Sequence, residues 1–164
     1  MTDIPCWNGQ GAMTRLHGTD FLIALEPAPD GLQEAFLLHL EGRVPKDGLF
    51  DAYRRLGEMA AGPVLNLVVV NVRLELQLDY DEFAAIHRGL RDRGVRHLNL
   101  AVANPEPASR HLVSFGDEVG RQQGLGIESR VFADRAAAVA GLRVLMAETP
   151  DMGRAAGGSG SRPA

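Results

Sequence analysis

The stretch Gly62-Pro63-Val64-Leu65-Asn66-Leu67-Val68-Val69-Val70 decides the fold, because its apolar residues do not alternate with polar ones. A strand with one face in water alternates, whereas a strand that is covered on both faces reads as a nearly continuous apolar run. Pro63 lacks a backbone N–H and is typical of the first residue of a strand. The stretch therefore predicts a central strand, Val64–Val70, that is buried on both faces of a sheet.

The residues before this stretch predict a hairpin and a helix. Two short apolar runs, Phe21–Leu25 and Ala35–Leu40, are separated by the turn signal Asp30-Gly31, which is typical of an antiparallel hairpin. Asp47 is a favourable N-cap residue, and apolar residues at helical spacing follow it until Gly62. The chain therefore enters the central strand from a helix.

The residues after the stretch continue the alternation of helix and strand. Asp79 and Glu82 have the spacing of a capping box, in which each side chain accepts a hydrogen bond from the other residue's backbone N–H. The pattern predicts a helix from Asp79 to Gly94, a strand Leu98–Val102, a helix Pro105–Gln123, a strand Ile127–Phe132 and a helix from Asp134 to Pro150. This order predicts an α/β fold with a largely parallel sheet of about four to five strands, an N-terminal antiparallel hairpin, about four helices and right-handed crossovers.

Polar segments without periodicity flank these elements. We interpret residues 1–18 as a disordered leader, residues 19–148 as one domain and residues 149–164 as a flexible, low-complexity tail. Met13-Thr14 repeats the opening Met1-Thr2, so the sequence leaves open at which methionine translation starts.

The composition excludes several classes of function. The formal net charge is -4, whereas nucleic-acid-binding domains are usually basic, so we expect no nucleic-acid partner. A single cysteine, Cys6, excludes an internal disulfide framework and a multi-cysteine metal site. No apolar run approaches the roughly 20 residues of a membrane span, and we recognise no secretory signal. We therefore expect a cytoplasmic protein without a metal or cofactor, and its oligomeric state stays open.

Three local stretches carry a resemblance to a known family. They are Gly62–Leu67, Gly94–Val102, and Ile127–Asp134 followed by Ala136, Ala137, Ala138 and Leu142. In this order they resemble the STAS domain of sulfate transporters and anti-sigma factor antagonists, in its stand-alone SpoIIAA-like branch, over about residues 19–147. The branch is related in fold to CRAL-TRIO lipid-binding domains. The resemblance implies a SpoIIAA-like fold and either membrane association or an apolar ligand.

The sequence departs from the family at two places. Anti-sigma factor antagonists present a phosphorylatable Ser before the second helix, but residues 72–81 contain neither Ser nor Thr. Asp79 and Asp81 already place negative charge at this helix start, where a phosphate would add a charge of roughly -2. Gly141 stands where the family often has a Trp. The resemblance therefore does not carry over the phosphorylation switch.

Residues 70–80 predict one wall of a candidate ligand site. Val70, Val72, Leu74, Leu76, Leu78 and Tyr80 alternate with polar residues, so an extended ribbon would have one apolar face. That face covers the core in one interpretation, and in the other it lines a pocket under the helix Pro105–Gln123. The pocket would be lined by Leu74, Leu76, Tyr80, Leu112 and Phe115. Gly116 and Gly120 indicate either close packing of this helix or a loosened lid.

Basic residues gather only around residues 88–96. Arg88, Arg91, Arg93 and Arg96 form a candidate docking patch for lipid headgroups, as in peripheral membrane contact, or for an acidic protein. The alternative is structural, because cations near the end of a helix are favoured by its dipole.

Catalytic motifs are sparse. No serine lies in a G-x-S-x-G elbow, and no histidines have the H-E-x-x-H spacing of a metal site. We expect a non-enzymatic binding or regulatory module that holds an apolar small molecule or lipid. The alternatives are a STAS-type regulator that binds a protein partner, and a small hydrolase or transferase that uses Ser109 or His111.

Overall fold

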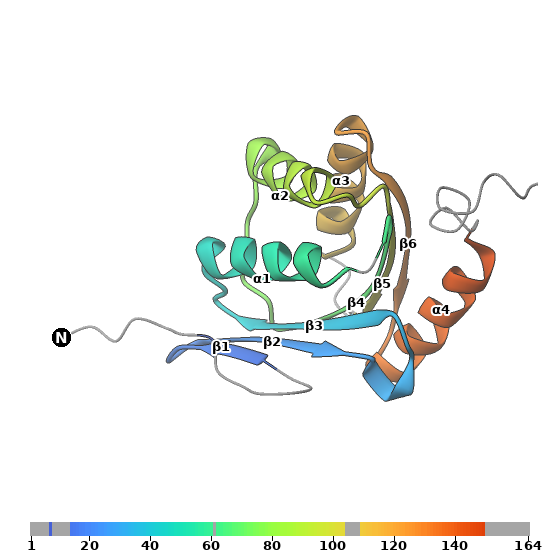
Figure 1. The fold of residues 1–164 in the computed structure, drawn as a ribbon. Helices are drawn as coiled ribbons and strands as arrows, with labels where there is room; N and C mark the ends of the chain where they lie inside the picture. The colour runs from blue at the N-terminus through green and yellow to red at the C-terminus, as the bar shows by residue number, and fades with distance from the viewer. Residues whose placement is uncertain (1–6, 8–13, 61, 104–108, 150–164) are drawn as a thin grey trace, which may run out of the picture.

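The chain forms an α/β fold around one mixed sheet, as the computed structural model shows (Figure 1). The structure describes Trp7 and residues 14–60, 62–103 and 109–149. Within these residues the sheet has 6 strands in the order β1-β2-β3-β4-β5-β6. The strands are β1 Thr14–His17, β2 Phe21–Pro27, β3 Ala35–Gly42, β4 Val64–Val72, β5 His97–Ala103 and β6 Gly126–Phe132. The helices are the short η1 Pro29–Gly31, then α1 Lys46–Met59, α2 Tyr80–Asp92, α3 Ser109–Gln122 and α4 Arg135–Glu148.

The topology explains where the helices lie. Strands β1 to β3 are antiparallel, whereas β3, β4, β5 and β6 run parallel and each follows its neighbour in the sequence. Right-handed crossovers that advance in one direction leave their helices on one face of the sheet. Accordingly, α1, α2 and α3 cover one face, while α4, which follows the last strand, covers the other (Figure 1). The predicted α/β fold with its N-terminal hairpin is confirmed.

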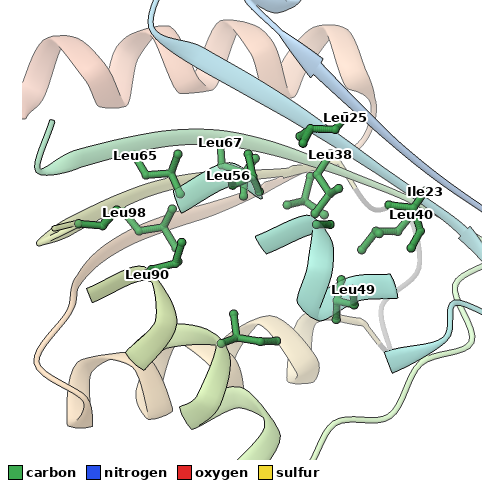
Figure 2. Close-up of a cluster of buried hydrophobic side chains, with 14 of the residues drawn as sticks. Ile23, Leu25, Leu38, Leu40, Leu49, Leu56, Leu65, Leu67, Leu90 and Leu98 are labelled. Atoms are coloured by element: carbon green, nitrogen blue, oxygen red, sulfur yellow. The ribbon is translucent and has the colours of Figure 1, made fainter. Parts of the chain in front are cut away.

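The central strand β4 is buried as predicted. Leu65 and Leu67 face α1 and α2, and Val68 faces α4; each is at most 1% exposed. Figure 2 shows Leu65 and Leu67 pointing from the sheet toward Leu56 of α1. A strand that removes both of its faces from water stabilises the fold by about 25 cal/mol per Å² of apolar surface.

Two local predictions need correction. The leader was predicted to extend to residue 18, but Thr14–His17 forms the edge strand β1, in which Leu16 is buried. Asp47 does not cap α1, because the helix begins one residue earlier, after Pro45. The capping box of Asp79 and Glu82 is present as predicted. The strand β1 was missed because it is short and has one buried apolar residue, Leu16, so its sequence shows no alternation of apolar and polar residues.

Trp7 also lies within the predicted leader, yet it packs against the core, and the Arg55 guanidinium carbon lies 4.7 Å from its ring centroid. The remaining leader residues, residues 104–108 at the predicted start of the third helix, and the tail from residue 150 lie outside the described residues.

A buried polar network links the sheet to the end of α4. The Asn99 amide donates to Asn66 Oδ1 at 2.8 Å and to Thr149 Oγ1 at 2.7 Å, and Asn99 Oδ1 lies 2.9 Å from His97 Nε2. The Thr149 hydroxyl in turn donates to the Leu145 carbonyl. Thr149, which was assigned to the tail, is therefore part of the folded domain.

We expect Asn99→Leu to lower the free energy of unfolding by about 2 kcal/mol, because a side chain of similar size leaves buried partners of Asn99 unpaired. Urea denaturation measures the loss. Gln33→Leu is the control, since Gln33 is exposed and the change should stay within about 0.5 kcal/mol. Equal stability of the Asn99 variant and the wild type would contradict a structural role for the network.

Candidate functional site

The segment between β4 and α2, residues 73–79, forms one wall of the site. Arg73 turns the chain with a φ of 45, and the Glu75 N–H donates to the Gly42 carbonyl at 2.9 Å. Beyond this contact Leu74, Leu76 and Leu78 are half-buried and pack against the core, while Glu75 and Gln77 are exposed. The predicted alternation is present, although the segment is not a strand of the sheet.

A cavity of about 90 Å³ lies beneath this segment. Its floor includes residues near the C-terminal ends of parallel strands, among them Val69, Asn71 and Val102. Leu112 and Val113 of α3 also line the cavity, together with residues of α2 and of the segment 73–79. In open α/β sheets ligands bind at this end of the strands. Residues from both predicted walls therefore line one cavity.

The predicted site residues divide into two groups. Leu74, Leu76 and Leu112 line the cavity. Tyr80 and Phe115 do not line it, and they are 42% and 41% exposed. The Tyr80 hydroxyl donates a hydrogen bond to Gln122 Oε1 at 2.9 Å. The Phe115 and Phe83 rings pack edge to face, with their centroids 5.4 Å apart.

Helix geometry accounts for both errors. Tyr80 is the first residue of α2, where the period of two that places Leu74 and Leu76 inward ends. At 3.6 residues per turn, Phe115 lies roughly 100° around α3 from the face formed by Leu112, Val113 and Gly116. Phe115 therefore stands at the outer edge of the helix.

Polar side chains that sequence analysis missed stand in the wall of the same cavity. They are Tyr53 of α1, Asn71 of β4, His87 of α2 and Asp117 of α3. His87 and Asp117 are each only 7% exposed. The four residues come from four elements, so no local spacing connects them, and only the tertiary structure brings them to one cavity.

Burial shifts the pKa of three of these groups. The His87 Nδ1 lies 2.7 Å from the Phe83 carbonyl and therefore carries a proton, and burial lowers the pKa of the imidazole. Burial also raises the pKa of Asp117, opposed by the hydrogen bond that the Ser129 hydroxyl donates to Asp117 Oδ2. Burial raises the pKa of Tyr53 to about 12. All three shifts favour the uncharged form.

The glycines of α3 lie at close contacts between elements. A Cβ on Gly116 would stand 2.8 Å from Phe83 Cε1, and one on Gly120 would stand 2.3 Å from Ile127 Cδ1. These distances are shorter than carbon contacts allow, so both positions require glycine unless α3 or its neighbours shift. The contacts favour the close-packing interpretation over a loosened lid.

Three arginines of the candidate docking patch donate hydrogen bonds to backbone carbonyls at the ends of α2 and α3. Guanidinium groups of Arg91, Arg93 and Arg96 donate to the carbonyls of Gln123, Gly89 and Arg91, respectively, at 3.3, 3.2 and 2.9 Å. Within the described part of the chain only Arg88 of the four has no such partner. This arrangement favours the structural interpretation of the cluster.

Other predicted chemistries find little support. His111 is exposed on α3, and the Ser109 side chain lies outside the described residues. Among the described residues no group of three or more His, Cys, Asp or Glu is arranged to hold a metal ion. Within the same residues no helix has the length and apolar character needed to cross a membrane.

Comparisons with protein-family models, with curated proteins and with solved structures give no match. The STAS resemblance therefore stays a prediction that rests on the residues themselves.

His87 predicts a pH dependence of stability. The pKa of His87 is lower in the folded state than in the unfolded chain. As the pH falls below about 6.5, the unfolded chain therefore binds a proton at His87 more readily than the folded chain, which favours unfolding. The contribution of His87 is therefore complete above this value and is lost below it. Asp117 contributes with the opposite sign, because its folded pKa is raised.

We expect the free energy of unfolding to fall less in His87→Gln than in the wild type between about pH 7.5 and about pH 5. Urea denaturation at several pH values measures the difference. His111→Gln is the control, because this ring is exposed, and it should follow the wild type. Parallel curves for His87→Gln and the wild type would contradict the buried, neutral imidazole.

Proposed function

We propose that the chain is a non-enzymatic, STAS-like binding module that holds an apolar or lipid-like ligand between residues 73–79 and α3. The observation that carries the proposal is the cavity itself, whose walls are the two segments with unexplained apolar residues. Leu74, Leu76 and Leu78 supply one wall, and Leu112 and Val113 supply the other. The resemblance to the SpoIIAA-like branch supports an apolar ligand independently.

The size of the cavity sets a condition on binding. Small-molecule sites usually have volumes of roughly 300–1,000 Å³, whereas this cavity has about 90 Å³. A lipid-like ligand must therefore displace a wall. Residues 73–79 are suited to move, because their backbone is not in the sheet. The Glu75 N–H bond to the Gly42 carbonyl and two ion pairs, Arg43–Glu75 and Arg73–Glu41, connect them to the end of β3. Segments with few such bonds open at low free energy.

Apolar burial supplies the driving force. Each Å² of apolar surface removed from water contributes about 25 cal/mol. The binding free energy of an alkyl chain that packs against Leu74, Leu76 and Leu112 therefore becomes more favourable as the chain lengthens. A charge in this wall would have to be desolvated when the ligand binds.

We expect Leu76→Asp to weaken binding of the neutral probe N-phenyl-1-naphthylamine by about tenfold or more. Probe fluorescence measures the affinity, and circular dichroism verifies the fold. Gln77→Asp is the matched control, because it adds the same charge one residue away on the exposed side of the segment. Equal affinities of the two variants would contradict the proposal.

A second variant tests the same site without a buried charge. Val113→Trp places a larger apolar side chain on α3 at the cavity wall, so it should compete with the probe for volume. We expect reduced binding in a folded variant. Unchanged binding in this variant would place the probe elsewhere on the protein.

A STAS-type protein partner is the second candidate function. The exposed aromatic rings of Tyr80 and Phe115 on neighbouring helices favour it, because aromatic side chains are enriched in protein interfaces. Native mass spectrometry of the purified full chain separates the two functions. A small molecule retained in the gas phase supports the first, and a ligand-free stoichiometric complex with another protein supports the second.

A further inference from the structure

The polar groups in the cavity wall indicate which head group a ligand would carry. Tyr53, Asn71, His87 and Asp117 interrupt a surface that is otherwise made of leucine, valine, isoleucine and phenylalanine side chains. A cavity that holds only hydrocarbon gains nothing from them, because polar atoms without partners weaken apolar burial. Their hydrogen-bonding capacity decides what they can bind.

Asn71 provides the clearest unpaired group. Its Oδ1 atom is buried, and no atom of the described residues donates a hydrogen bond to it. Leaving a buried carbonyl oxygen without a donor is unfavourable, and a ligand N–H or O–H at this atom would remove the cost. Asn71 therefore requires a donor.

Asp117 and His87 add two further acceptors. Asp117 Oδ2 accepts the hydrogen bond from Ser129, and no described residue donates to the other carboxyl oxygen. Because the His87 Nδ1–H donates to the Phe83 carbonyl, the neutral ring has only an acceptor left, at Nε2. The donors in the wall are the Tyr53 hydroxyl and the Nδ2 amide of Asn71.

The undonated Asn71 Oδ1 and the Asp117 carboxyl group beside it in the cavity wall carry the inference, which rests on the ligand-binding function proposed above. We propose that the cavity selects amphiphiles whose head group donates hydrogen bonds, such as a primary amine or a primary amide, and discriminates against alkyl carboxylates. The head group binds Asn71 Oδ1 and the Asp117 carboxyl group, and the alkyl chain lies against Leu74, Leu76 and Leu112. A carboxylate head would bring acceptor oxygens and negative charge against acceptors that already lack donors.

A head-group series with one alkyl chain tests the proposal. Octylamine, octanamide and octanoate compete for the wild-type protein with N-phenyl-1-naphthylamine, and the concentration for half displacement is measured. We expect octylamine and octanamide to displace the probe at concentrations at least about tenfold lower than octanoate. Octanamide controls for attraction of a cation to the acidic chain, because it is neutral.

Two variants test the assignment of the acceptors. Asp117→Asn keeps an oxygen for the Ser129 hydroxyl but removes the charge, so octanoate should improve relative to octylamine by about tenfold. Asn71→Leu removes the unpaired oxygen, so octanamide should lose its advantage over octanoate. Gln77→Leu makes a similar polar-to-apolar change on the exposed side of the neighbouring segment and should leave the order of the three ligands unchanged.

The outcomes separate this inference from the function on which it rests. If the probe does not bind the wild type, both fail. If the probe binds but octanoate displaces it as well as octylamine and octanamide do, the head-group inference is overturned while the binding function stands. Should either variant fail to fold in circular dichroism, the wild-type series and the other variant still decide the proposal.

Discussion

Burial of β4 on both faces is the constraint on which the rest of the structure depends. Leu65 and Leu67 must be covered on one side, and Val68 on the other. The parallel strands β3 to β6 advance in one direction, so their three crossover helices all serve the first side. Among the helices of the described residues, α4 covers the second side, and it begins after the last strand is complete. A fold built in this way has one thickly covered face and one thinly covered face.

The thin face leaves little space for a site. On it, Gly141 of α4 stands so near Phe132 that an added Cβ would lie 2.0 Å from Phe132 Cζ. Asn99 and Thr149 close the same face with a hydrogen bond of 2.7 Å. Both contacts hold α4 close to the sheet.

The thick face has a different problem, because three helices must pack together as well as against the sheet. Gly116 lets α3 approach Phe83 of α2, and Gly120 lets it approach Ile127 of β6. Near the C-terminal ends of β4 and β5, the helices leave a gap that residues 73–79 cover. The cavity is therefore a consequence of the crossover arrangement, which explains why an apolar segment joins β4 to α2 where a shorter loop would suffice.

Local patterns predict most of the fold and three of the residues that line the cavity, Leu74, Leu76 and Leu112. The buried run at Val64–Val70 and the capping box at Asp79 depend on residues that are close together in the sequence. Local sequence patterns therefore predict both. The strand Thr14–His17 was too short to show a period, and Tyr80 lies where one period replaces another. The polar groups of the cavity were out of reach for a further reason. Tyr53 and Asp117 are far apart in the sequence, and each has the surroundings of an ordinary helix residue until the chain folds.

The polar groups also bear on how the cavity can discriminate between ligands. Apolar contact alone separates molecules that differ by one methylene only by about 1–3 kcal/mol. A site with buried groups that need hydrogen bonds discriminates more strongly, because a wrong ligand leaves those groups unpaired. Asn71 Oδ1 accepts no hydrogen bond from the described residues, so a ligand that donates to it pairs a buried oxygen. A ligand that donates a hydrogen bond to Asn71 Oδ1 gains affinity in addition to that of its apolar contacts. In such a complex the leucine-rich wall contributes binding free energy, and Asn71 and Asp117 contribute selectivity.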